Sequence, residues 1–186
     1  MKEISLNILD IAQNSITANA KTIEIGIKIE TKRDIMEVVI IDDGKGMSKE
    51  LLDRVIDPFT TTRTTRKVGL GLPLFKESVE QTGGSFEIHS ELNVGTKVTA
   101  RYVYSSIDRM PLGDIGETMM LLVGTKEGIR FIFRYRLDDQ EFLFDTQEMV
   151  KILGADVSLM EMEVLAFIKE FINNGLYEII GGREIV

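Results

Sequence analysis

The sequence predicts an α+β fold whose sheet has one buried face and one solvent-exposed face. Isoleucines at every second position over 23–29 alternate with polar residues and glycine, the pattern of a half-buried strand. Apolar residues recur at helical spacing over 4–18, which predicts an amphipathic helix before that strand. Residues 85–91 and 96–104 alternate around a Gly-containing turn, as β-hairpins do. One-sided strands and amphipathic helices together favour the α+β class.

The remaining N-terminal elements follow in order. Residues 31–34 are polar and predict a turn, and the mostly apolar run 36–41 predicts a second strand. A short helix is expected over 48–55, capped by Ser48. A longer helix is expected over 70–82, ended by Gly83 and Gly84.

Composition limits the function classes. The 186 residues can form one ordinary domain, or one domain with a small appendage. A net charge of −8 argues against a general nucleic-acid or anionic-membrane binder. No apolar run approaches the roughly 20 residues that span a bilayer, and the start of the chain does not resemble a signal peptide. The absence of cysteine excludes disulfides and thiol catalysis. Together, these observations lead us to expect a soluble cytoplasmic protein.

Two glycine-containing runs carry the strongest functional signal. The first, 42–47, places Asp42 at the end of a strand, followed by Gly44 and Gly46, which suits a backbone lying against a flat ligand. The second enters a helix as Gly69-Leu70-Gly71, and a helix start attracts phosphate. Each run alone is weak evidence, because ordinary turns use the same residues.

The first helix carries a polar stripe. Glu3, Asn7, Asp10, Asn14 and Thr17 share one side of it, and Asn, Asp and Thr are poorer helix formers than the Glu and Lys usual on a solvated face. The stripe therefore favours a site over a water-facing surface. Asp10 and Asn14 lie one turn apart. An Asn carbonyl oxygen suits Mg²⁺, and a nearby carboxylate could deprotonate a nucleophile.

The stretch 60–67 is rich in threonine and carries three positive charges without an acid. Such a loop beside a helix start could close over phosphates as a lid. The alternative is a solvated surface loop. Phe59 could anchor one end of it. His89, the only histidine, is expected within a strand as a structural or surface residue.

These motifs, in this order, resemble the GHKL ATPase superfamily, which includes gyrase-type topoisomerases, histidine kinases, mismatch-repair ATPases and anti-sigma-factor serine kinases. The resemblance covers about residues 1–104. It implies the Bergerat fold, a two-layer α/β sandwich with helices on one face of a mixed, mostly antiparallel sheet. It also implies that the cofactors are ATP and Mg²⁺.

The resemblance assigns roles to residues. Asn14 is expected to bind Mg²⁺, and Asp10 stands where a general-base carboxylate is placed, usually Glu. Asp42 matches the residue that accepts a hydrogen bond from the adenine amino group, and Asp43 stands where many members carry Asn. The other residues expected to contact the nucleotide are Gly44, Gly46, Met47, Phe59, Arg66 or Lys67, Gly69, Gly71, Leu72 and Thr96.

Residues 105–186 are predicted to form a small α/β C-terminal subdomain of unknown role, following an ATP-binding domain at 1–104. A linker over 105–113 leads to a helix capped by Asp114, and a hairpin is expected over 129–144. Helices are expected to start at 145 and at Ser158, which opens a Ser-x-x-Glu capping box. The last helix is expected to reach Asn174 and stop at Gly175.

The function expected first is that of an ATP–Mg²⁺ binding regulatory kinase acting on a partner protein, as in the anti-sigma serine kinases. Histidine autophosphorylation is disfavoured, because no dimerising helical hairpin with a phosphoacceptor is present and His89 is a poor substitute. The alternatives are an ATP-hydrolysing switch and a non-catalytic ATP-binding scaffold. The sequence leaves the partner, the phosphoacceptor and the oligomeric state open, with a homodimer among the options.

Overall fold

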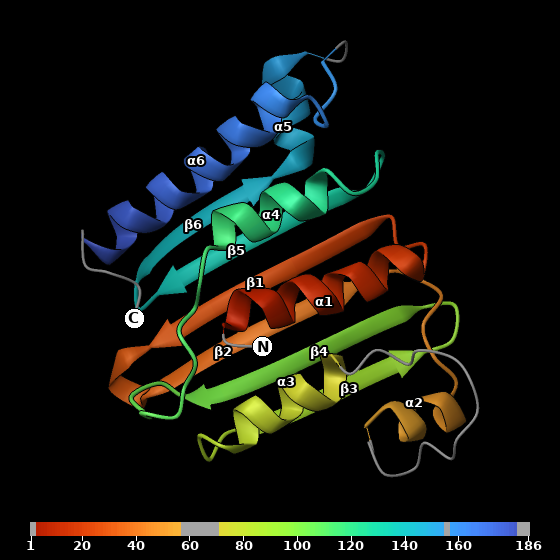
Figure 1. Cartoon of the computed structure of the whole chain (residues 1–186), viewed down its shortest axis with the longest axis vertical. Coiled ribbons are helices and arrows are strands. Elements are labelled where there is room, and N and C mark those ends of the chain that lie inside the picture. Colours follow the sequence, from red (N-terminus) through yellow and green to blue (C-terminus); the bar gives the residue numbers. More distant parts are fainter. Residues whose placement is uncertain (1–2, 57–70, 155–156, 182–186) are drawn as a thin grey trace.

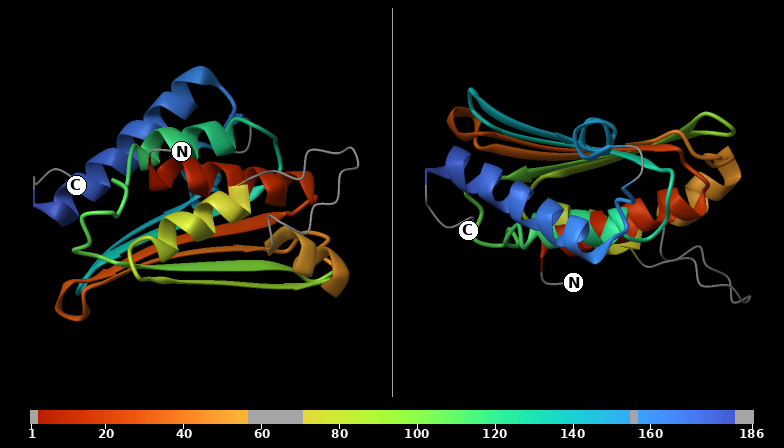
Figure 2. Two further views of the ribbon diagram at one scale, coloured as in Figure 1. Left: turned by 60° about the horizontal axis from the view of Figure 1, so that its bottom comes forward. Right: turned by 90° about the horizontal axis from the view of Figure 1, so that it is seen from above.

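The computed structural model of the protein describes residues 3–56, 71–154 and 157–181, and has two layers. One layer is a six-stranded sheet with the order β3-β4-β2-β1-β5-β6, and helices cover one of its faces (Figures 1 and 2). The strands are β1 (Thr22–Glu30), β2 (Ile35–Asp42), β3 (Ser85–Glu91), β4 (Gly95–Val103), β5 (Arg130–Leu137) and β6 (Gln140–Asp145). The helices are α1 (Ile4–Thr17), α2 (Lys49–Ile56), α3 (Gly71–Glu80), α4 (Ile115–Val123), α5 (Thr146–Leu153) and α6 (Met162–Ile180).

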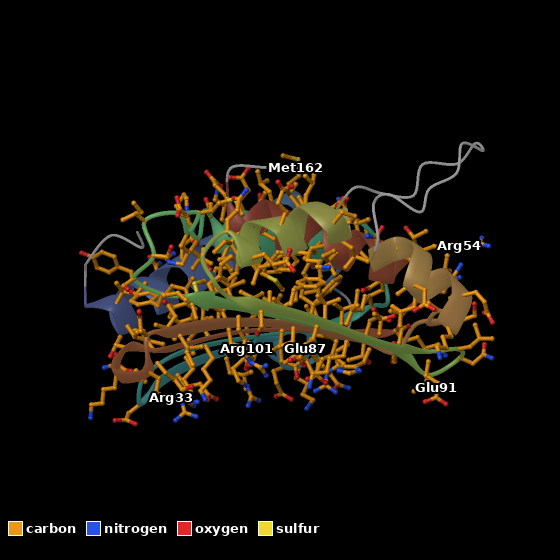
Figure 3. All side chains as sticks on the ribbon, turned by 90° about the horizontal axis from the view of Figure 1, so that it is seen from below. Arg33, Arg54, Glu87, Glu91, Arg101 and Met162 are labelled. Atoms are coloured by element: carbon orange, nitrogen blue, oxygen red, sulfur yellow. The ribbon has the colours of Figure 1, made fainter. Side chains whose placement is uncertain are left out.

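The two faces of the sheet differ as the alternation in β1 predicts. Ile23, Ile25 and Ile27 are at most 1% exposed and pack beneath the helices, whereas Glu24 and Lys28 face solvent. Side chains such as Glu87 and Arg101 project from the helix-free face (Figure 3). Arg101 bridges Glu37 and Glu87 across three strands there. The predicted two-layer sandwich, with one covered face, is confirmed.

The C-terminal third extends the same sheet. β5 pairs in parallel with β1, from Thr22 opposite Arg130 to Ile29 opposite Leu137, and β6 pairs antiparallel with β5. The other strand pairs are antiparallel, so the sheet is mixed and mostly antiparallel. Phe131, Phe133 and Tyr135 of β5 are buried in one continuous core with the isoleucines of β1. The expected appendage is thus built onto the edge of the sandwich, while its division from residues 1–104 as a domain stays a prediction.

Two predictions about α6 are wrong. The capping box at Ser158 does not open the helix, which begins at Met162 with Glu161 at its N-cap. The helix also continues through Gly175 to Ile180 and ends at Gly181, whose backbone is left-handed (φ 68°). Gly175 serves packing instead, because a Cβ there would overlap the ring of Phe142 on β6. A glycine that looks like a stop signal is a contact point between helix and strand.

Other helix boundaries agree with the sequence patterns. The side chain of Asp114 accepts a hydrogen bond from the Glu117 amide (2.8 Å) and caps α4 as expected. Within the described ranges, no helix is both long enough and apolar enough to cross a membrane.

Candidate functional site

A cavity of about 360 Å³ lies between the helices α1 and α2, the end of β2 and the start of β4. Six residues expected to contact the nucleotide or Mg²⁺ line it: Asn14, Asp42, Gly46, Met47, Leu72 and Thr96. They come from α1, β2 and the turn after it, the start of α3, and β4. Residues up to 82 positions apart along the chain therefore line one cavity.

The carboxylate of Asp42 is held in one orientation. It lies at the end of β2, is only 9% exposed, and accepts hydrogen bonds from the Ser15 hydroxyl (2.6 Å) and the Gly44 amide (2.9 Å). Each oxygen takes one of these bonds and keeps a second lone pair, because an ionised carboxylate can accept about four hydrogen bonds. Asp42 can therefore accept further hydrogen bonds from a ligand in a fixed direction.

The turn after β2 lies against the β3–β4 hairpin. Gly46 has a left-handed backbone (φ 60°), and a Cβ there would overlap the carbonyl of Glu91. The next amide, that of Met47, donates to the Ser90 hydroxyl (2.9 Å). This close approach brings the backbone of the turn and the side chain of Met47 to the cavity wall.

Asp10 does not line the cavity but meets the start of α3 next to it. A Cβ on Gly71 would overlap the carboxylate of Asp10, so only glycine allows this contact. Asp10 lies one turn before Asn14, and Leu72, the residue after Gly71, borders the cavity. Free N–H groups at a helix start favour a negative charge, from Asp10 or from a phosphate.

Asp43, next to Asp42, has a different role. Its carboxylate accepts hydrogen bonds from the backbone amides of Lys21 (2.7 Å) and Thr22 (2.9 Å) and so anchors the start of β1. Partial burial raises the pKa of Asp43, but the hydrogen bonds from Thr22 and Lys21 outweigh it and leave the pKa below its ordinary value. The residue therefore fixes the loop that follows α1.

Four of the expected nucleotide contacts, Phe59, Arg66, Lys67 and Gly69, lie outside the described residues, as does the basic stretch 60–67. Two contributors were missed in the sequence: Ser15, which holds Asp42, and Ser90, which holds Met47. Ser15 follows Asn14 inside the helix, and Ser90 is a polar residue on the helix-facing side of β3. Both serines place a hydroxyl at a position that otherwise faces the core, and this pattern could have identified them in the sequence.

A second hollow, of about 560 Å³, borders the same strand ends. It shares Asp42, Ile88 and Thr96 with the first, but neither Asn14 nor Gly46 lines it. It includes His89 of the helix-free face, whose side chain is 75% exposed, with Nε2 3.9 Å from the Glu87 carboxylate. We assign the site to the smaller cavity because the motif residues converge there.

Curated proteins that resemble the chain include bacterial kinases and sensor proteins. Sporulation kinase D of Bacillus subtilis (strain 168) is 38% identical over 100 residues, which cover 53% of this chain and 19% of that kinase. Sensor protein KdpD of Clostridium acetobutylicum is 36% identical over 92 residues, covering 47% of this chain and 10% of that protein. The chain thus spans less than a fifth of the length of these relatives.

Among solved structures, the ATPase domain of Aquifex aeolicus MutL complexed with ADP is similar, with a TM-score of 0.55. The alignment covers 82% of this chain and 69% of that one at 14% identity, so the likeness concerns the fold. The model of the family described as "Histidine kinase-, DNA gyrase B-, and HSP90-like ATPase" matches residues 1–105, more than half of the chain. The chain therefore belongs to the family of histidine kinase-, DNA gyrase B- and HSP90-like ATPases.

Proposed function

We propose that the cavity binds ATP together with Mg²⁺, and that the protein uses it as a kinase acting on a partner protein. The observation that carries this proposal is the convergence of Asp42, Asn14 and Thr96 on one cavity, with Asp10 at the adjacent start of α3. The family match supports ATP as the nucleotide.

The residues present fit a purine nucleotide. Asp42 offers acceptor lone pairs to an exocyclic amino group, and the turn at Gly46 brings the backbone close to a flat ring. Met47 and Leu72 supply apolar surface to the cavity. Small-molecule sites usually combine such apolar walls with a few fixed polar groups.

The residues at the other end fit a metal-bound triphosphate. The Asn14 carbonyl oxygen would hold Mg²⁺, which shares its coordination shell with phosphate oxygens and water. When bound, Mg²⁺ neutralises phosphate charge. The amides at the start of α3 would bind phosphate oxygens. Asp10 would accept the proton of the attacking hydroxyl and orient that group.

The kinase activity rests on the relatives, which are named as kinases or sensor proteins. In this proposal the phosphoacceptor lies on a partner protein. An anti-sigma-like serine kinase acting on a separate protein is the form we favour.

An ATP-hydrolysing switch is the second candidate, favoured by one contact. α1, which carries Asp10 and Asn14, packs against α4, where the Thr118 hydroxyl donates to the Ser5 carbonyl (3.5 Å). α4 in turn packs along α6. A shift of α1 on nucleotide binding would therefore reach the C-terminal third. In this case Asp10 would activate water instead of a protein hydroxyl.

One experiment tests both the kinase and the ATP-hydrolysing switch. Purified protein is incubated with Mg²⁺ and γ-labelled ATP, with and without candidate partner proteins, and labelled protein and free phosphate are measured. Asp10→Asn should reduce either activity by at least about 100-fold. ATP affinity, measured by titration calorimetry, should change by less than about threefold, since a general base acts mainly on the chemical step.

The matched control is Asp139→Asn, the same substitution at the exposed turn between β5 and β6. It should leave binding and turnover unchanged. Label on a partner supports the kinase, and free phosphate without a partner supports the switch. If ATP binds but the label stays on the nucleotide, the remaining function is that of a non-catalytic ATP-binding scaffold. Full activity in Asp10→Asn would remove Asp10 from the mechanism.

A further inference from the structure

The hydroxyl of Ser90 stands at the centre of three hydrogen bonds beside the cavity. It accepts from the Met47 amide (2.9 Å), donates to the Gly95 carbonyl (3.0 Å), and lies 2.9 Å from the Thr96 hydroxyl. Ser90 is on the helix-facing side of β3, and Thr96 follows Gly95 at the start of β4. The three bonds tie the turn after β2 to the hairpin that forms the opposite wall.

The direction of the third bond follows from counting protons. A serine hydroxyl has one proton and two acceptor lone pairs. The Gly95 carbonyl has no proton to give, so that bond uses the proton of Ser90. The Met47 amide occupies one lone pair. All three bonds form together only if Thr96 donates its own proton to the second lone pair of Ser90.

This arrangement changes what Thr96 can offer to a ligand. With its only proton directed at Ser90, the Thr96 oxygen presents lone pairs to the cavity and no donor. Thr96 is also directly opposite Asp42 in the β2–β4 ladder, so both side chains lie on the same face within about 5.5 Å at their Cβ atoms. The carboxylate of Asp42 likewise accepts only.

We propose that Ser90 is a specificity-determining residue, which selects a 6-aminopurine over a 6-ketopurine by fixing Thr96 as an acceptor. The inference rests on the proposed nucleotide binding and deepens it. An amino group satisfies the acceptor pair of Asp42 and Thr96. A keto oxygen would face two sets of lone pairs, and buried acceptors without a donor are costly.

Without Ser90, the Thr96 hydroxyl is free to rotate and donate to a keto oxygen. Ser90 is therefore a positioning residue that acts through Thr96. The alternative is that Ser90 merely holds the turn and the hairpin together, in which case its loss weakens every purine nucleotide by the same factor.

The test compares the affinities of ATP and ITP by titration calorimetry with Mg²⁺. ATP carries a 6-amino group beside an unprotonated N1, and ITP carries a 6-keto group beside a protonated N1. The natural chain should prefer ATP. Ser90→Ala should lower the ATP/ITP affinity ratio by roughly five- to tenfold, about the size of one net hydrogen bond. Ser90→Thr keeps the hydroxyl and should restore most of the ratio.

A double-mutant cycle separates the two roles of Ser90. Thr96→Val removes the acceptor and should lower the ratio by itself. Adding Ser90→Ala to Thr96→Val should then change the ratio no further, because Ser90 acts through Thr96. If Ser90→Ala fails to fold, an unchanged ratio in Thr96→Val alone still overturns the proposal.

The outcomes distinguish the two proposals of nucleotide binding and base selection. If the natural chain binds neither ATP nor ITP, the proposed function itself fails. If it binds ATP, but Ser90→Ala weakens ATP and ITP by equal factors, the binding proposal stands and the selectivity role of Ser90 is overturned.

Discussion

In the N-terminal part of the sandwich, Gly46 and Gly71 let other groups approach the cavity, whereas Gly175 in the C-terminal part lets a helix pack on a strand. Gly46 accommodates the Glu91 carbonyl and Gly71 the Asp10 carboxylate. Gly175 accommodates the ring of Phe142, half-buried between α6 and β6. The same residue type thus allows close approaches at the candidate site in one region and a helix–strand contact in the other.

The carboxylates of the two regions differ in the groups that bind them. Asp145 pairs with Arg130, and Asp114 pairs with Lys169, while each also caps a helix. Asp42 is held by a hydroxyl and an amide, and among the described residues no cation lies within ion-pair distance of it. The C-terminal carboxylates have their charge balanced by the protein itself. Asp42 keeps its acceptor capacity for a ligand.

The largest expected effect comes from Asp42→Asn, which keeps the shape of the side chain and removes its charge. Affinity for ATP should fall by about 10- to 150-fold, the loss of a hydrogen bond to a charged group. The matched change Asp114→Asn should lower the melting temperature and leave ATP affinity unchanged. Equal ATP affinity in Asp42→Asn and the natural chain would remove the contrast between the two carboxylates.

The next effect is on stability. Gly175→Val should destabilise the fold by about 2 kcal/mol, because the new side chain overlaps the Phe142 ring and overpacks the α6–β6 contact. Ala166→Val, on the exposed side of the same helix, should stay within about 0.5 kcal/mol of the natural chain. Denaturant unfolding measures both, and ATP affinity should not change in either. A Gly175→Val protein as stable as the natural chain would show that the contact with Phe142 does not require glycine.

Asp145→Ala should cost about 1 kcal/mol, as expected for the loss of an N-cap. The hydrogen bond from Arg130 lowers the pKa of Asp145 below its ordinary value. A carboxylate whose pKa is lower in the folded state stabilises the fold above the unfolded pKa near 4. That contribution is lost as pH falls through the folded value.

The stability difference between Asp145→Ala and the natural chain should therefore be full at pH 7 and shrink as pH falls below about 4. Denaturant unfolding at several pH values measures it. A difference that stays constant down to pH 2 would show that the charge of Asp145 does not contribute.

The smallest effect is expected on the helix-free face. Arg101→Gln removes the bridge between Glu37 and Glu87, and exposed ion pairs contribute at most about 1 kcal/mol. The loss should diminish in 1 M salt, which screens such pairs. ATP affinity should not change, although Arg101 belongs to the N-terminal part. A changed affinity would extend the site to the face opposite the helices.

Local patterns were sufficient for much of this molecule. The alternation of isoleucines in β1 and the helical period of α1 each depend on neighbours within a few residues, so both could be predicted. The acceptor at the end of β2 and the pair Asp10–Asn14 could be predicted for the same reason. The placement of β5 could not, because its residues pair with residues of β1 that lie 108 positions earlier in the chain.

By itself, the sequence determined which faces of the strands are buried, where the turns require glycine, and which polar side chains lie one helical turn apart. Only the tertiary structure decided that Gly175 meets Phe142, that Ser15 holds Asp42, and that the hydroxyls of Ser90 and Thr96 face each other. The physical reason is the range of the interactions. Burial and backbone conformation are set by residues close in the chain, whereas a hydrogen-bond partner is set by whichever distant strand or helix the fold brings alongside.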